Sequence, residues 1–200
     1  VKKVFFISGG GAMYLDDSLG KNQNLDGVCM LHEQGASIAA EAYARVNDSY
    51  GCCLVTSGPG ATNALTGLVG SYIDSIPVVF ISGQVKRADL KDNTGLRQFG
   101  IQEVDIISMV KEHTKYAVRV DDPLLIRYEL EKAASLAMEG RPGPVWIDIP
   151  LDIQASEVDV ESLQSYTEHK EYPASENEVD TTIQMLNSAK RPVLMLGHGI

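Results

Sequence analysis

The sequence predicts an open α/β fold, in which a three-layer parallel β-sheet carries helices on both faces. Short apolar runs that do not alternate with polar residues indicate strands buried on both sides. A glycine-rich or polar turn follows each run, and a segment with helical periodicity follows each turn. Strands and helices that alternate in this way are typical of a parallel sheet sandwiched between helices.

Six apolar runs are the expected strands. They are Val4–Ile7, Gly27–Met30, Gly51–Thr56, Pro77–Ser82, Tyr116–Val120 and Val145–Ile149. Cys29, Cys52 and Cys53 fall inside these runs, where a thiol behaves as a small apolar side chain. Because their number is odd and no CxxC pair exists, we expect neither a disulfide framework nor a zinc site, and we expect a reducing cytoplasm.

Five segments between the strands have helical periodicity. They are Ala12–Leu19, Gln34–Asn47, Gly60–Ser71, Val104–Val110 and Pro123–Gly140. In the second segment the i, i+3, i+4 and i+7 positions are Ala36, Ala39, Ala40 and Tyr43. Together they form a narrow stripe on one face of the helix, which suits close packing on the sheet. Asp122 and Pro123 are expected to open the last helix as its cap and first turn, and Gly140 to close it.

The alternation of strands and helices stops after Pro150. We therefore expect residues 1–155 to form one domain and residues 156–179, rich in acids, Ser and Pro, to form a linker. A helix near Asp180–Ala189 and a strand over Pro192–Leu196 are expected to begin a second, truncated domain over residues 180–200. The chain reads as a piece of a larger polypeptide.

Composition and charge exclude several classes of function. The 200 residues are 44% hydrophobic and 22% charged, as in an ordinary globular protein. A net charge of −10 argues against nonspecific binding to nucleic acid or to an anionic membrane, since both need a basic face. No apolar stretch approaches the roughly 18 residues that a membrane helix needs. Small molecules remain as the expected ligands.

Four turns are expected to meet at one edge of the sheet. In open α/β sheets ligands lie beyond the carboxyl ends of the strands, and the turns at this edge are Ser8–Ala12, His32–Ala36, Ser57–Asn63 and Ser82–Val85. For each turn alone, the glycine after the strand has a simpler explanation, because glycine permits a tight turn.

Two kinds of nucleotide-binding site have features in common with these turns. A phosphate-binding P-loop requires a lysine after its glycines, and the segment "SGPGATN" has an alanine and a threonine there. A dinucleotide site is compatible with Gly9 and Gly11 after the first strand and with Glu33 as the ribose-binding acid. Tyr14 occupies the third glycine position and argues against it, so dinucleotide binding is kept only as an alternative.

Glu33 is the candidate acid–base group. Its apolar neighbours Met30 and Leu31 favour the protonated carboxyl, whereas a helix N-terminus favours the carboxylate. Such opposed influences suit proton transfer, and a simple helix cap is the alternative. His32 is interpreted as a structural residue. Asn63 carries an amide that both donates and accepts, which suits the edge of a polar heterocycle.

A polar stretch, "KRADLKDNTGLRQ", carries Arg87, Lys91 and Arg97. Two interpretations stay open for it. It is either a solvated surface loop or a lid that contacts the substrate, as long loops beside a ligand site often do.

Five motifs, in order along the chain, resemble those of a known family. They are "HEQGASIAAEAYAR", "VTSGPGATNALTGL", "SYIDSIPVVFISGQV", "IQEVDI" and "GRPGPVWIDIPLDIQ". Over roughly residues 3–155 the chain resembles the N-terminal pyrimidine-binding domain of thiamine-diphosphate-dependent enzymes, a Rossmann/flavodoxin-like fold, and acetolactate synthases in particular. The tail resembles the start of the family's central domain.

The resemblance implies a role for each candidate site residue. Glu33 would hydrogen-bond N1′ of the cofactor's aminopyrimidine and, by sharing its proton there, promote loss of the thiazolium C2 proton. Pro59 and Asn63 would lie near the pyrimidine and Gln102 near the thiazolium, with Gln84 as a weaker candidate. The implied reaction joins a decarboxylated 2-oxo acid to a second carbonyl compound.

The resemblance also implies partners outside this chain. The diphosphate and Mg²⁺ would be held by a carboxy-terminal domain whose motif is absent from this sequence, and FAD could occupy the central domain. Each site would form between two subunits, so a homodimer or homotetramer is implied. This piece alone is not expected to be active.

Two departures from the family pattern bear on the reaction. The first turn, Ser8–Gly11, lacks the proline that commonly precedes the glycine pair. Ile101 stands where acetolactate synthases usually carry an aromatic residue, on the acceptor side of the pocket. A 2-oxo acid decarboxylase or another carboligase is therefore an alternative, and a non-catalytic binding module is an alternative of another class.

Overall fold

The computed structural model describes residues 1–92, 94–167, 174–195 and 197. The chain divides into two compact units, residues 1–168 and 169–200, and each is described by itself.

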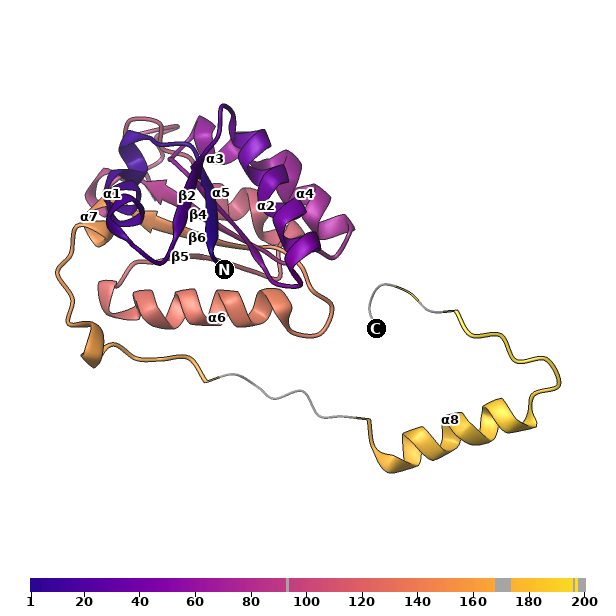
Figure 1. The fold of residues 1–200 in the computed structure, drawn as a ribbon. Coiled ribbons are helices and arrows are strands. Elements are labelled where there is room, and N and C mark those ends of the chain that lie inside the picture. The colour runs from indigo at the N-terminus through magenta and orange to yellow at the C-terminus, as the bar shows by residue number, and fades with distance from the viewer. Residues whose placement is uncertain (93, 168–173, 196, 198–200) are drawn as a thin grey trace. The chain divides into compact units, whose positions relative to one another are not determined.

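The first unit contains a six-stranded sheet in which every pair of neighbours is parallel (Figure 1). The strands are β1 (Lys3–Phe6), β2 (Asp26–Cys29), β3 (Gly51–Val55), β4 (Val78–Gln84), β5 (Tyr116–Arg119) and β6 (Val145–Pro150). Their order across the sheet is β2-β1-β3-β4-β6-β5. All six expected strands are confirmed, with small shifts at their ends.

Helices lie between the strands as expected, and a further short helix that was not expected follows β6. In the first unit they are α1 (Met13–Lys21), α2 (Glu33–Asn47), α3 (Pro59–Asn63), α4 (Leu65–Ile73), α5 (Ile106–Val110), α6 (Ile126–Met138) and α7 (Leu151–Gln154). Short 3₁₀ turns are η1 (Gly10–Ala12), η2 (Arg87–Asp89), η3 (Lys111–His113), η4 (Pro123–Leu125) and η5 (Val160–Ser162). The Asp122 side chain accepts a hydrogen bond from the Leu124 amide (2.9 Å), which confirms the expected cap.

The single helix expected over Gly60–Ser71 is wrong, because the structure divides it into α3 and α4. At the junction the Ala64 amide bonds the carbonyl of Ala61, three residues back (3.1 Å). This tighter turn ends α3 at Asn63, and α4 starts again at Leu65.

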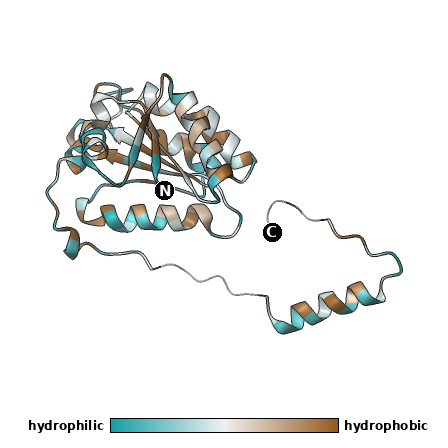
Figure 2. Ribbon diagram, viewed as in Figure 1, coloured by the Kyte–Doolittle hydropathy of each residue, from teal (hydrophilic) through white to brown (hydrophobic). Residues whose placement is uncertain are grey.

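The sheet lies between two layers of helices, as Figure 1 shows. Helices α2, α4 and α5 pack on one face, and α1, α6 and α7 pack on the other. On the first face the buried ring of Trp146 stacks on Phe80, with centroids 5.2 Å apart. The residues adjacent to this pair in the same strands, Val79 and Ile147, face the opposite layer of helices. The central strands are mostly hydrophobic in Figure 2, as burial on both faces requires.

Small residues bring α2 close to the sheet and to α4. Ala36 and Ala40 of the expected stripe are fully buried, whereas Ala39 and Tyr43 are only partly buried. On the facing helix, a Cβ added to Gly67 would overlap the hydroxyl of Ser37. The two helices therefore touch where neither carries a large side chain.

The three cysteines do not share one environment. Cys52 and Cys53 are buried in the central strand β3, and burial raises the pKa of the Cys52 thiol to about 12. The interpretation of Cys29 as a buried apolar residue is wrong. It is exposed because β2 is an edge strand, whose outer residues lack a second neighbour.

Part of the segment expected as a linker packs against the first unit. Leu163 is buried, the Tyr166 amide donates to a Glu131 carboxylate oxygen (2.8 Å), and the Tyr166 ring meets Tyr128 edge-on. Residues 156–167 are thus attached to α6 and its surroundings. The division into functional domains at residues 155 and 180 stays a prediction.

The second unit contains α8 (Glu176–Ser188), which confirms a helix in this region. A capping box opens it, because the Ser175 hydroxyl accepts from the Glu178 amide while the Glu178 side chain accepts from the Ser175 amide. The expected strand is wrong over residues 192–195, where the backbone is irregular, and Leu196 lies outside the described residues. A strand needs a paired neighbour, and the described part of this unit contains none.

Replacement of Gly83 tests the contact between β4 and the first turn. An added Cβ would overlap the carbonyl of Gly11, so Gly83→Ala is expected to lower the free energy of unfolding by about 3 kcal/mol. Gly20→Ala is the matched control, because nothing lies within 4 Å of its Cβ position; an alanine in this helix is expected to stabilise by up to about 1 kcal/mol. Urea denaturation measures both, and an unchanged stability of Gly83→Ala would contradict the contact.

Candidate functional site

The first turn lies directly against the turn between β3 and α3. The Gly11 amide donates to the Thr56 hydroxyl (3.0 Å), and a Cβ on Gly9 would lie 2.5 Å from the Thr56 Cβ. A Cβ on Gly11 would lie 2.5 Å from the Ser57 hydroxyl. Close contact with the Thr56 and Ser57 side chains thus accounts for both glycines, so a dinucleotide is not needed to explain them. We call this edge, where β1 to β4 end, the carboxyl edge.

Glu33 and Asn63 meet at the carboxyl edge. Glu33 is the first residue of α2, Asn63 is the last residue of α3, and the Asn63 Nδ2 donates to Glu33 Oε2 at 2.7 Å. The same Nδ2 lies 3.2 Å from the His32 Nε2. Among the described residues no side-chain hydrogen bond caps α2, and Glu33 contacts a neighbouring helix instead of capping its own.

The second oxygen of Glu33 lies beside Gly60. A Cβ built on Gly60 would lie 3.6 Å from Glu33 Oε1 and 2.7 Å from the Thr56 Cγ2, so glycine leaves this oxygen uncovered. None of the hydrogen bonds among the described residues involves Oε1. The half-buried carboxyl is therefore fixed through one oxygen and open at the other.

Gln102 and Pro59 lie at the same turn. Gly58, which precedes α3, has a φ of +60°, and a Cβ there would overlap the carbonyl of Gln102. Pro59 and Gln102 are both exposed. The structure thus brings the candidates Glu33, Pro59, Asn63 and Gln102 to the carboxyl edge, while their roles stay predictions.

Comparison with known proteins identifies the family. Residues 1–109 match the family described as "Thiamine pyrophosphate enzyme, N-terminal TPP binding domain". The chain belongs to this family.

Acetolactate synthases are among the relatives that align with the whole of this TPP-binding chain. The chain is 38% identical over 200 residues to acetolactate synthase isozyme 2 large subunit of Escherichia coli (strain K12), and it covers 35% of that protein. It is 35% identical over 204 residues to the chloroplastic acetolactate synthase of Arabidopsis thaliana, of which it covers 30%. In both matches the whole chain aligns, and it spans about a third of the length of the curated relatives.

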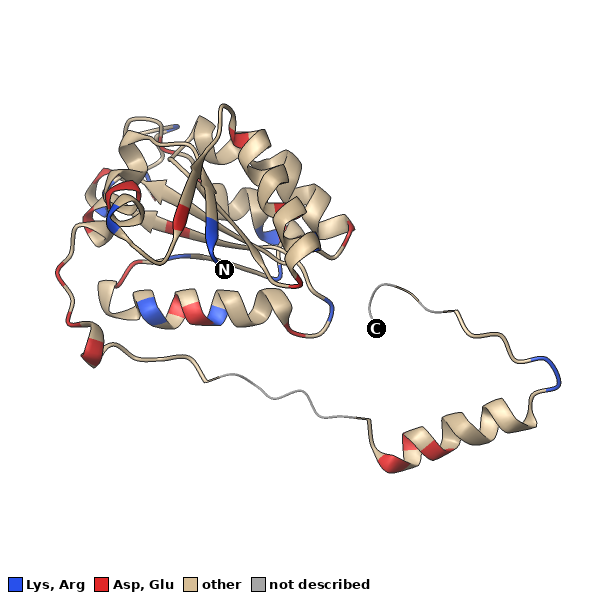
Figure 3. Cartoon of the chain, in the orientation of Figure 1, with Lys and Arg blue, Asp and Glu red and all other residues tan. Residues whose placement is uncertain are grey.

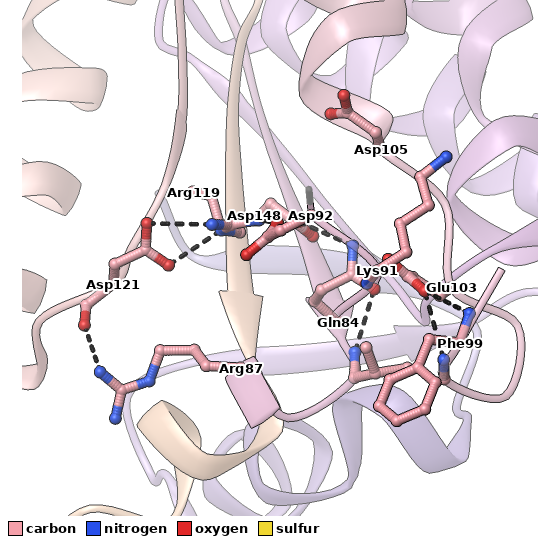
Figure 4. Close-up of polar contacts among 12 residues, drawn as sticks. Gln84, Arg87, Lys91, Asp92, Phe99, Glu103, Asp105, Arg119, Asp121 and Asp148 are labelled. Carbon is pink, nitrogen blue, oxygen red and sulfur yellow. Dashed lines mark hydrogen bonds and ion pairs between the residues drawn. The ribbon is translucent and has the colours of Figure 1, made fainter. Parts of the chain in front are cut away.

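Gln84 of the domain does not belong with the Glu33 group. It is 2% exposed, and its Nε2 donates to Asp148 Oδ2 (3.0 Å) and to the Val104 carbonyl (2.9 Å), as Figure 4 shows in part. Its Oε1 accepts from the Val85 amide (3.0 Å). All of its polar atoms therefore serve buried protein contacts.

Asp148 is a buried acid that the sequence reasoning missed. The Ser82 hydroxyl donates to its Oδ1 (2.6 Å) and in turn accepts from the Trp146 indole N–H (2.8 Å). Burial raises the pKa of Asp148 to about 7, although the hydrogen bonds from Ser82 and Gln84 act to lower it. The available signal was a charged residue inside the apolar run "VWIDIP".

The basic loop is tied down at its start. The Arg87 side chain donates to an Asp152 carboxylate oxygen (2.7 Å) and to the Asp121 carbonyl (2.7 Å). The Lys91 ammonium donates to the Arg97 carbonyl within the loop (3.4 Å). Arg87 thus makes structural contacts with other parts of the protein, and Lys91 makes one within the loop.

Charged residues of both signs are distributed along the chain. Figure 3 shows Lys and Arg interspersed with Asp and Glu along the chain. Within the described residues, no helix has the length and apolar character to cross a bilayer. In the same part of the chain, no group of three or more His, Cys, Asp and Glu is arranged to hold a metal ion.

The pH dependence of stability tests the Asp148 environment. Its pKa rises from an ordinary 3.8 to about 7 in the folded state, so between these values the folded protein holds a proton that the unfolded chain has lost. This contribution to stability is complete below about pH 4 and is lost as the pH rises to about 7, by up to about 4 kcal/mol.

Asp148→Asn, neutral at every pH, is expected to flatten this fall in urea unfolding measured from pH 4.5 to 8. The matched control is Asp89→Asn at an exposed position, which should keep the wild-type slope. Equal slopes in Asp148→Asn and the wild type would contradict the assignment.

Proposed function

We propose that this chain supplies the pyrimidine-binding part of the active site in a thiamine-diphosphate-dependent carboligase of the acetolactate synthase type. The observation that carries the proposal is the Glu33 carboxyl, held by Asn63 through Oε2 (2.7 Å) and open at Oε1 on the carboxyl edge. The family and the names of the relatives support the same chemistry.

The residues present fit the pyrimidine end of this cofactor. A half-buried carboxyl with one uncovered oxygen suits a ring nitrogen that shares a proton, and Gly60 leaves room beside that oxygen. Pro59 stiffens the exposed start of α3, which would border the ring. When bound, thiamine diphosphate supplies the electron sink for decarboxylation of a 2-oxo acid.

The hydrogen bond from Asn63 decides where a proton on Glu33 belongs. Because Oε2 accepts an N–H, a proton on the neutral acid belongs on Oε1, the oxygen that would meet N1′ of the aminopyrimidine. Glu33 is thereby oriented to share that proton along one direction, as general acid–base catalysis requires. Asn63 acts as the residue that fixes this orientation.

The rest of the active site is proposed to lie outside this chain. The relatives are about three times as long as the aligned segment, which leaves room for a diphosphate and Mg²⁺ domain and for a central domain that could hold FAD. We infer that the site is completed by a second subunit, in a homodimer or homotetramer. A cytoplasmic location also stays a prediction, since the relatives include a chloroplastic protein.

A 2-oxo acid decarboxylase is the second candidate. The observation that favours it is Ile101, which is 87% exposed beside Gln102 and replaces the aromatic residue expected on the acceptor side. A side chain other than an aromatic one there changes the room for the second carbonyl compound, which favours protonation of the decarboxylated fragment, as in a decarboxylase, or an acceptor other than pyruvate, as in another carboligase.

Replacement of Glu33 tests the proton-sharing role. In the full-length protein with thiamine diphosphate and Mg²⁺ bound, Glu33→Gln is expected to slow C2–H exchange of the cofactor by about 10²- to 10⁴-fold, because the amide cannot share the proton. Exchange is measured by NMR after transfer to D₂O and acid quench. Glu112→Gln at an exposed position is the control, and wild-type exchange in Glu33→Gln would reject the role.

The product formed from pyruvate separates the two candidate reactions. We expect the full-length protein to release acetolactate, because the decarboxylated fragment would add to a second pyruvate instead of being protonated. Acetaldehyde as the main product would make the protein a decarboxylase. Gas chromatography of the same reaction mixture detects both.

A further inference from the structure

The carboxylate of Glu103 is the centre of the loop that follows β4. Its Oε1 accepts from the Lys91 amide (2.6 Å), and its Oε2 accepts from the amides of Phe99 (2.9 Å) and Gly100 (3.2 Å). Figure 4 shows Glu103 with its Lys91 and Phe99 partners. Glu103 is 9% exposed, so one nearly buried side chain joins two distant parts of the loop.

An ionised acid suits this position better than any neutral side chain. An ionised carboxylate only accepts hydrogen bonds, and here three backbone N–H groups converge on it. Burial by itself would raise the pKa of Glu103, but the bonds from Lys91, Phe99 and Gly100 outweigh it and lower that pKa. The fold therefore favours the charged form.

The neighbouring Gln102 has a constrained backbone. Its φ of +59° lies in the left-handed region, which is unfavourable for a residue other than glycine. On one side the Gly58 turn lies against its carbonyl. On the other side Glu103 is held by three amides, and the Val104 carbonyl accepts from Gln84 Nε2 (2.9 Å). Residues 102–104 are thus fixed by contacts before and after Gln102.

We propose that Glu103 is a positioning residue, whose carboxylate folds the loop back onto residue 103 and thereby sets Gln102 toward the reacting 2-oxo acid. This inference rests on the proposed function, because the role of Gln102 does. A purely structural role would stabilise the domain without a specific effect on substrate use.

The first test is kinetic and uses the full-length enzyme with pyruvate, thiamine diphosphate and Mg²⁺. Glu103→Gln keeps the shape of the side chain but turns an NH₂ group toward a backbone N–H donor. The kcat/KM for pyruvate is therefore expected to fall about 10- to 100-fold, mainly because KM rises. C2–H exchange should stay at the wild-type rate, because no hydrogen bond among the described residues joins the Glu33–Asn63 pair to this loop. Glu112→Gln should match the wild type in both measurements.

A double-mutant cycle tests whether Glu103 acts through Gln102. If it does, Gln102→Ala and the double variant Gln102→Ala/Glu103→Gln should have the same kcat/KM, since the first change already removes what Glu103 positions. Losses that multiply in the double variant would overturn the proposal. So would a Glu103→Gln enzyme that is less stable but has the wild-type KM.

Hydrogen–deuterium exchange tests the anchoring without relying on activity. In the wild-type enzyme the amides of Lys91, Phe99 and Gly100 should be protected, and in Glu103→Gln they should exchange at least about tenfold faster. Unprotected wild-type amides, or unchanged protection in the variant, would overturn the proposal.

If Glu103→Gln fails to fold, Glu103→Asp replaces it in the kinetic test and in the hydrogen–deuterium exchange test. The shorter acid keeps the charge and is expected to retain part of the protection and of kcat/KM. Full wild-type values in Glu103→Asp would also overturn the proposal. Wild-type C2–H exchange in Glu33→Gln would reject the proposed function. The amide-exchange result for Glu103 would still hold, because it does not depend on activity.

Discussion

Close contact between turns at the carboxyl edge is the constraint on which the candidate site depends. A parallel sheet ends neighbouring strands at one edge, and its turns approach one another this closely only where glycines lack side chains. Gly83 lies against Gly11, and Gly9 lies against Thr56. Gly58 lies against the carbonyl of Gln102. These approaches place α3 beside the start of α2. The bond between Asn63 and Glu33 follows from that placement.

Two buried acids near this edge, Asp148 and Glu103, have pKa values that are shifted in opposite directions. Asp148 receives two side-chain donors, which do not offset burial, and its pKa is raised to about 7. Glu103 receives three backbone amides, which more than offset burial, and its pKa is lowered. Gln84 connects the two regions, because one Nε2 bonds both Asp148 and the Val104 carbonyl. The depth of burial, which is greater for Asp148 (1% exposed) than for Glu103 (9% exposed), and the number and kind of donors together decide the charge of each acid.

The departures from expectation have local physical causes. Cys29 is exposed because the tertiary order of strands puts β2 at the edge of the sheet. The helix after β3 is divided because one amide at Ala64 bonds three residues back, a choice that periodicity does not encode. Residues 192–195 have the composition of a strand but lack a neighbour among the described residues to pair with.

The sequence by itself determined the strands, most of the helices and the edge at which the turns meet, because hydrophobic periodicity and turn chemistry are properties of short segments. It also singled out Glu33 and Asn63, since the family motifs contain them. Only the tertiary structure decided that Asn63 holds one oxygen of Glu33, that Gln84 is committed to Asp148, and that Glu103 gathers the loop. Those outcomes depend on partners far apart in the chain, and burial and hydrogen-bond geometry exist only once the chain has folded.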